Sequence, residues 1–233
     1  NKMIRPTTVP QSLEELIIEQ AIAREALRLS FIQHKEFATS LKGIQKERTI
    51  SDAFDQSSSG ESLVNMMDLD LLVGSGGVLS HAPRRAQCAR MLIDSFNPEG
   101  ITQLAVDSIF MMPQLGVLAN IEKEDLAEEA RIAALEVFHK DCLIKLGSCI
   151  APIGQHKSNQ DLLKYEILTD GKKYEGTLKY GELLLLPIPN GEYNCIIQPN
   201  GNVDIGFGKG NNFKGTIYGG DVGVALDGRG REI

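Results

Sequence analysis

The chain has 233 residues, of which 42% are hydrophobic, so it is long enough for one large domain or for two smaller domains with a core each. Its net charge is −7 and its basic residues are dispersed, which excludes a nucleic-acid-binding face and leaves small molecules or proteins as partners. No apolar run approaches the ~20 residues that span a bilayer, and the polar start lacks the apolar stretch of a signal peptide, so we expect a cytoplasmic protein that does not enter a membrane.

The first predicted element is a long helix from Ser12 to about Phe37. Ser12 followed three residues later by Glu15 is the signature of a capping box at a helix start. The apolar residues that follow are spread widely around the helix: Leu13, Leu16, Ile17, Ala21, Leu27, Phe31 and Ile32. A helix with so wide an apolar cover normally packs on two sides, which predicts an interior element of a larger body.

Residues 52–61 combine small polar residues with acids, a composition typical of an exposed loop. Two interpretations are open. The loop closes over a binding site, or it is a solvated connector without a role of its own.

The segment from residue 69 to residue 113 alternates between strand and helix patterns, as an α/β layer does. An apolar run at 69–73 leads into the glycine loop, Gly74-Ser75-Gly76-Gly77, and residues 83–96 follow with helical spacing. A second apolar strand is predicted at 103–107.

A second long helix is predicted from Asp125 to about Leu146. Asp125 and Glu128 form another capping signature, and the apolar residues that follow share one face. Gly147 is interpreted as the residue that stops this helix.

After Gly154 the pattern changes to short strand-like runs at 165–168, 181–186, 194–198, 213–218 and 222–226. The dipeptides Asp170-Gly171, Asn190-Gly191 and Asn200-Gly201 favour tight hairpins with positive φ angles. The glycine-rich run 206–210 lacks a following helix and is interpreted as a bend between strands. The sequence therefore predicts an α/β domain over residues 1–154 and an all-β barrel or sandwich over residues 155–233.

The cysteine and histidine residues predict neither a metal site nor a disulfide framework. The four cysteines, Cys88, Cys142, Cys149 and Cys195, lie far apart without paired spacing and are interpreted as reduced thiols. The four histidines have no helical pairing that would bind a metal.

The glycine loop is the one pattern that points to ligand chemistry. Glycines at 74, 76 and 77 leave backbone N–H groups open to a ligand, and the helix that follows directs its positive end at the same place. An anionic or ribose-bearing ligand fits such a loop, while a steric need for glycine at a strand-to-helix turn is the alternative. The loop matches neither a Walker loop nor the dinucleotide fingerprint.

Side chains around the loop complete the candidate site. Asp107 ends an apolar strand, where ligands bind in open α/β sheets. Ser80 and His81 are candidate helix caps, and Arg84 and Arg85 either meet phosphates or are solvated. The predicted cofactor-binding residues are Gly74, Ser75, Gly76, Gly77, Ser80 and Asp107, and no catalytic residue is assigned.

An apolar strand that ends in Gly-x-Gly-Gly resembles the adenosine-contacting motif of the actin, Hsp70 and sugar kinase superfamily. Further segments resemble the C-terminal half of the MutL-type (GlmL) accessory proteins of adenosylcobalamin-dependent glutamate mutase and ornithine aminomutase. The resemblance covers essentially the whole chain and is carried by residues 6–27, 48–54, 71–84, 105–113, 141–154 and 226–231.

This resemblance implies half of an actin-like ATPase fold followed by the β domain. The function it implies is an ATP- or ADP-binding protein that reactivates a coenzyme B12-dependent mutase as a chaperone does, with a mutase subunit as partner. The phosphate loops, the catalytic acid and most of the Mg²⁺ ligands are expected in an N-terminal half or a partner chain that completes the cleft. ATP hydrolysis is expected only when that half is present.

Two other functions stay open at this stage. In the first, the glycines only turn the chain and the protein is a scaffold that docks a mutase subunit through its β domain. In the second, the chain belongs to a small-molecule kinase of the same superfamily, although the sequence supplies no substrate pocket or catalytic base for it.

Overall fold

The structure is a computed structural model that describes residues 4, 7–38, 63–121, 127–154 and 159–230, so the predicted loop at 52–61 and the predicted cap Asp125 lie outside the described residues. The described helices are α1 (Leu13–Phe37), α2 (Gly77–Ser80), α3 (Arg85–Phe96), α4 (Met112–Ala119) and α5 (Ala127–Val137), with the short turns η2 (Met66–Asp68) and η3 (Phe138–Cys142). The described strands are β1 (Leu71–Gly74), β2 (Gly100–Asp107), β3 (Leu143–Ala151), β4 (Asp161–Leu168), β5 (Lys173–Lys179), β6 (Leu183–Leu186), β7 (Gly191–Pro199), β8 (Phe213–Gly219) and β9 (Val224–Asp227).

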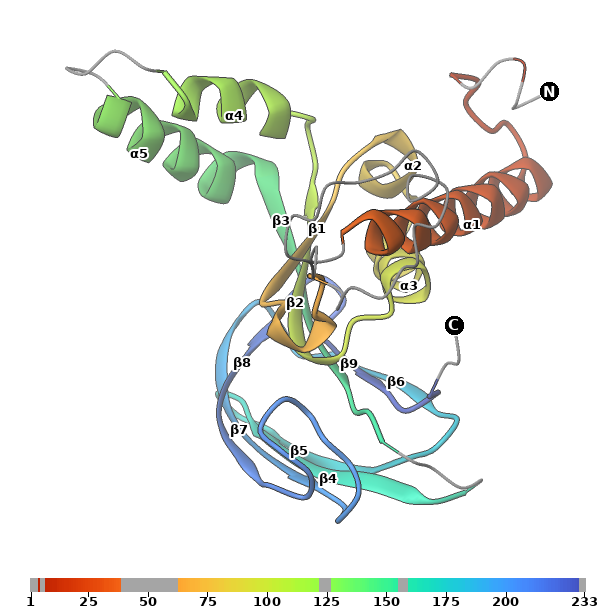
Figure 1. Cartoon of the computed structure of the whole chain (residues 1–233), viewed down its shortest axis with the longest axis vertical. Helices are drawn as coiled ribbons and strands as arrows, with labels where there is room; N and C mark the ends of the chain where they lie inside the picture. The colour runs from red at the N-terminus through yellow and green to blue at the C-terminus, as the bar shows by residue number, and fades with distance from the viewer. Residues whose placement is uncertain (1–3, 5–6, 39–62, 122–126, 155–158, 231–233) are drawn as a thin grey trace, which may run out of the picture.

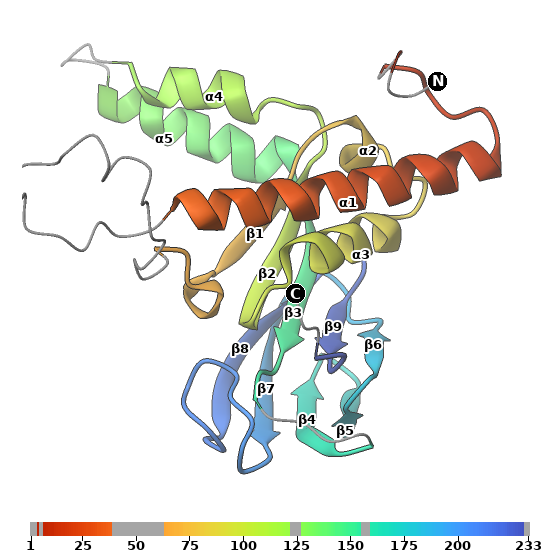
Figure 2. The same ribbon diagram turned by 45° about the vertical axis from the view of Figure 1, so that its right-hand side comes forward.

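The strands form a five-stranded sheet of order β1-β2-β3-β9-β6 and a four-stranded sheet of order β5-β4-β7-β8. In the larger sheet β1 is parallel to β2, β3 is antiparallel to β2, and β9 is parallel to β3. Helices α1, α2 and α3 lie together beside this sheet, and α4 and α5 project beyond its end (Figure 1). The four-stranded sheet lies at the opposite end, as the turned view also shows (Figure 2).

The larger sheet crosses the predicted division of the chain at residue 154. β6 and β9 come from the predicted 155–233 domain, yet they pair in the same sheet as β1, β2 and β3. A cut at residue 154 therefore does not separate the two sheets. That one part of this fold is half of an actin-like ATPase stays a prediction.

Helix α1 confirms the predicted start and contradicts the predicted environment. The Ser12 hydroxyl accepts a hydrogen bond from the Glu15 N–H at 3.2 Å, as a cap should. No residue of α1 is buried, and Ile17 and Ile18 keep 59% and 51% of their surface exposed. Expecting an interior helix was wrong because α1 packs mainly on α3, where Phe31 meets Phe96, with a smaller contact to α2, and much of its apolar surface stays exposed.

The predicted helix is confirmed as far as Cys142, and its predicted end near Leu146 is wrong. Helix α5 ends at Val137, the π-helical turn η3 continues it to Cys142, and β3 follows as a central strand whose last six residues are all buried. Gly147 is not a helix stop but part of a β-bulge, since Leu104 pairs with Gly147 and the next residue, Ala105, pairs with Lys145. A short apolar run fits either pattern locally, and pairing with strands on both sides selects the strand.

In the C-terminal part, all five predicted strands are confirmed and β5 was missed. Asp170-Gly171 connects β4 to β5 in a hairpin closed by a bond from the Thr169 N–H to the Lys172 carbonyl at 2.9 Å. Asn190-Gly191 and Asn200-Gly201 do not close tight hairpins, because β6 pairs with β9 and a loop of residues 200–212 separates β7 from β8. Neither Gly171 nor Gly201 has the positive φ that we expected.

Two main cores hold the described part together. One lies where the four-stranded sheet meets the far end of β3 and β9, around Ile150, Leu163, Ile197 and Leu226. The other lies between α3 and the larger sheet. All four cysteines are buried and free, and burial raises the pKa of Cys88 and of Cys195 to about 11, so neither thiol is an activated nucleophile.

Candidate functional site

Pairing of β1 with β2 brings the glycine loop and Asp107 to one edge of the larger sheet. The two strands run parallel, with Gly74 opposite Val106, so both end at the same edge. Ser75, the next residue after β1, donates its hydroxyl to the Asp107 carboxylate at 3.4 Å. The predicted site residues are thus neighbours in the folded chain.

Asp107 is fully buried and is occupied by the protein itself. Besides the Ser75 hydroxyl, its carboxylate accepts hydrogen bonds from the backbone N–H groups of Met111 at 3.4 Å and Met112 at 3.1 Å. These donors lie at the start of α4, where helix N–H groups lack partners within the helix. Asp107 therefore caps α4 from inside the protein.

Ser80 also has a structural partner. Its hydroxyl is buried and donates to the backbone carbonyl of Asp107 at 2.6 Å. We had expected Ser80 and His81 to cap the start of a helix. They lie instead at the end of α2. His81 contacts the ring of Phe110 edge-on at 5.4 Å between centroids.

The arginines after the loop contact protein groups near the end of α2 and the start of α3. Arg85 donates from its guanidinium to the Ser80 carbonyl at 2.7 Å, which satisfies an acceptor at the end of α2. The backbone N–H of Arg84 donates to the Gln87 side chain at 3.0 Å. We had expected Arg85 either to be solvated or to bind phosphate. Its contact with the Ser80 carbonyl matches neither alternative.

The three glycines of the loop are needed for different reasons. A Cβ at Gly74 would lie 3.1 Å from side-chain carbons of both Leu79 and Leu92, so packing of α2 and α3 accounts for this glycine. Gly76 has a φ of +107°, which favours glycine, and a Cβ at either Gly76 or Gly77 would meet no atom within 4 Å. Open space therefore lies beside the last two glycines.

The helix that begins at this open space is α2, of four residues, rather than the long helix that we expected; α3 begins only at Arg85. The carbonyl of Gly76 accepts from the N–H groups of Leu79 and Ser80 at 3.0 and 2.9 Å. Within the described residues, no acceptor is found for the N–H groups of Gly76, Gly77 and Val78. These three backbone donors stand where the glycines leave space for a ligand.

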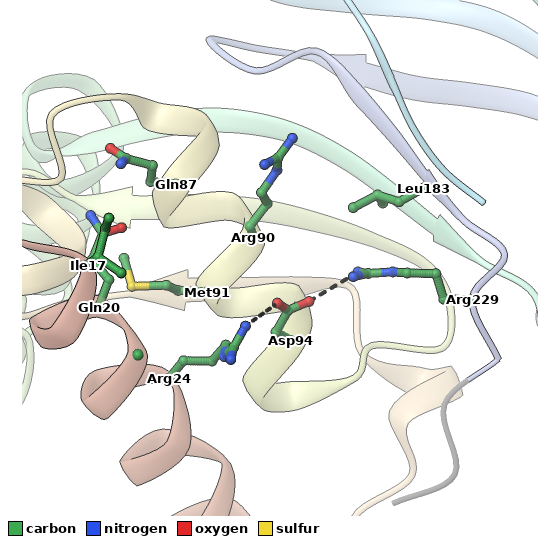
Figure 3. A pocket seen from close by; sticks show the side chains of 10 residues that line it. Ile17, Gln20, Arg24, Gln87, Arg90, Met91, Asp94, Leu183 and Arg229 are labelled. Atoms are coloured by element: carbon green, nitrogen blue, oxygen red, sulfur yellow. Dashed lines mark hydrogen bonds and ion pairs between the residues drawn. The ribbon is translucent and has the colours of Figure 1, made fainter. Parts of the chain in front are cut away.

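A second candidate site, which we call the α1/α3 cavity, was not predicted from the sequence. Its volume is about 530 Å³, and it is lined by Ile17, Gln20, Ala21 and Arg24 of α1, by Gln87, Arg90, Met91 and Asp94 of α3, and by Leu183 and Arg229 (Figure 3). These residues come from four distant segments and form no motif. The run 226–231 was noted only for its resemblance, so the one available signal was an arginine in a segment already singled out.

Ion pairs centred on Asp94 fix one end of this cavity. Its carboxylate contacts the guanidinium of Arg24 at 3.3 Å and that of Arg229 at 3.1 Å. Arg229 also pairs with Asp227 at 2.8 Å. Burial disfavours the charged form of Arg229, but the bonds to Asp227 and Asp94 outweigh it and raise the pKa of this guanidinium, so it stays charged.

Across the described ranges, no group of three His, Cys, Asp or Glu side chains is placed to hold a metal ion. A search of the same residues for a helix of sufficient length and apolar character to cross a bilayer finds none.

Comparison with protein families gives one match. The family model described as MutL protein matches residues 1–134, which is more than half of the chain and includes the glycine loop and Asp107. Searches of curated proteins and of solved structures give no match.

Proposed function

The chain belongs to the MutL family, the accessory proteins of glutamate mutase, and from this premise we propose that it is a nucleotide-binding protein that reactivates a coenzyme B12-dependent mutase. In this proposal the glycine loop holds the adenosine end of ATP or ADP at the edge of an actin-like ATPase half. A phosphate-binding half or partner chain completes the cleft and supplies most of the Mg²⁺ ligands. The free state of all four cysteines fits a protein of the reducing cytoplasm.

The observation that carries the proposal is the open space beside Gly76 and Gly77 at the end of β1. No side chain fills this space, and the N–H groups of residues 76–78 lack acceptors within the described part of the chain. Backbone donors at the carboxyl end of a strand, followed by a helix start, are the arrangement that α/β proteins use for phosphate- or ribose-bearing ligands.

Nucleotide would act by biasing two conformations of the complex with the mutase. A ligand shifts such an equilibrium only through different contacts in the two states. Hydrolysis requires a carboxylate and a metal ion at the γ-phosphate. Asp107, the one carboxylate among the predicted site residues, is buried and its side chain accepts hydrogen bonds from the start of α4, which supports leaving hydrolysis to the completing half.

Substituting Gly77→Asp tests the nucleotide site. Gly77 is the first residue of α2, has no positive φ and faces open space, so aspartate should fit there and leave the fold intact. Its side chain would fill the space and repel phosphates. We expect at least a tenfold loss of ADP affinity by isothermal titration calorimetry.

The matched control is Gly116→Asp. Gly116 lies in α4, also with no atom within 4 Å of an added Cβ, and the substitution adds the same charge. It should leave ADP affinity within about twofold. Equal affinities for the two variants, or no binding of ADP by the unsubstituted chain, would reject the nucleotide site.

The adaptor function remains the second candidate, because Gly74, Ser80 and Asp107 already have structural roles. The isolated segment 155–233 is unsuitable as a test, since β9, which pairs with β6, also pairs with β3 outside this segment. Capture of mutase subunits by the full chain, with and without ADP, separates the two functions. If the amount of mutase captured is changed neither by ADP nor by Gly77→Asp, the adaptor function is favoured.

A further inference from the structure

Positive charge is concentrated in the α1/α3 cavity of an otherwise acidic protein. Arg24, Arg90 and Arg229 line the cavity, and Asp94 is the one acidic residue among its lining residues. The whole chain carries a net charge of −7. Such a local excess of arginine favours an anionic ligand, because guanidinium groups bind phosphate and carboxylate through paired hydrogen bonds.

Arg90 is the arginine that the protein leaves available. The Asp94 carboxylate is taken by Arg24 and Arg229, as the dashed lines in Figure 3 show. Arg90 stands apart from them between Gln87 and Leu183, and no described residue forms an ion pair or hydrogen bond with it. Asp94 thus positions two arginines without neutralising the third.

The remaining lining suits a ligand with an organic part. The Gln20 side-chain nitrogen is buried and has no acceptor in the described part of the chain, which is costly unless a ligand or water supplies one. Met91 and Leu183 add apolar surface on the α3 and β6 sides. A volume of about 530 Å³ lies within the range of small-molecule sites and exceeds what a single inorganic ion needs.

We propose that the α1/α3 cavity binds a small organic anion that carries phosphate or carboxylate groups. Arg90 makes the direct contact to the anionic group. Arg24 and Arg229, whose charges are offset by Asp94 and Asp227, hold this end of the cavity in place, and the organic part lies against Met91 and Leu183. The site shares no lining residue with the glycine loop, so it does not depend on the proposed nucleotide site.

Titration calorimetry with pyrophosphate and, separately, with citrate tests this site. We expect the full chain to bind at least one of them, and Arg90→Gln to weaken that binding tenfold or more. Arg131→Gln is the matched control, because Arg131 is an exposed arginine of α5 outside the cavity and its loss changes the net charge equally. That control should stay within about twofold. Preference for pyrophosphate would identify a phosphate ligand, and preference for citrate a carboxylate.

Two results would overturn the proposal. One is that neither anion binds the full chain. The other is that Arg90→Gln and Arg131→Gln weaken binding equally, which would show a general effect of net charge. Gly77→Asp should leave anion binding in the cavity unchanged, so a failure of the nucleotide site and a failure of this site give different outcomes.

Discussion

Replacing Gly147 with alanine is expected to prevent folding or to lower the free energy of unfolding by more than about 3 kcal/mol. A Cβ at Gly147 would lie 1.7 Å from the backbone carbonyl oxygen of Gly223, a distance at which two atoms cannot coexist. The φ of Gly147 is +126°, which strains every residue except glycine.

Relaxation cannot relieve this clash at low cost, because backbone meets backbone. The N–H groups of Val222 and Gly223 donate to the Leu146 carbonyl at 3.0 and 3.2 Å, so moving Gly223 away breaks the connection that leads into β9. Denaturant unfolding measures the loss. Gly171→Ala is the control, since Gly171 has open space and no positive φ, and it should cost less than about 1 kcal/mol. Equal stability of the two variants would contradict the bulge geometry.

Replacing Asp107 with alanine is expected to lower the free energy of unfolding by about 2 to 4 kcal/mol. The substitution removes the acceptor for the N–H groups of Met111 and Met112 and for the Ser75 hydroxyl, and it leaves a cavity in a fully buried position. Asp107→Asn keeps the volume and one acceptor oxygen and should lose less.

The same pair of variants separates a structural role from ligand binding. Denaturant unfolding and ADP calorimetry are measured on both. A loss of ADP affinity for Asp107→Ala without a loss of stability would show that Asp107 acts through a ligand contact rather than as the cap of α4.

Local signals predicted the features that depend on local chemistry. The Ser12 cap and the strand before the glycine loop were both correct, since each depends on a few adjacent residues. The helix predicted up to Leu146 failed because its last part, β3, is defined by pairing with β2 and β9, which come from distant parts of the chain. Gly147 looked like a helix end and is instead required by the approach of Gly223.

The candidate sites show the same division. The sequence identified the glycine loop and Asp107, because a strand followed by glycines is a local pattern. It could not show that the Ser80 hydroxyl donates to the Asp107 backbone carbonyl, or that α2 intervenes before α3. The α1/α3 cavity could not be predicted from the sequence, since Arg24, Asp94 and Arg229 come together only in the folded chain.

The most direct test of the nucleotide site is amide hydrogen exchange of residues 76–78 with and without saturating ADP. We predict that exchange at these three amides slows when ADP is bound, because the ligand becomes the acceptor that the described protein groups do not provide. Unchanged exchange at residues 76–78 in the presence of saturating ADP would contradict the assignment of the glycine loop as the adenosine site.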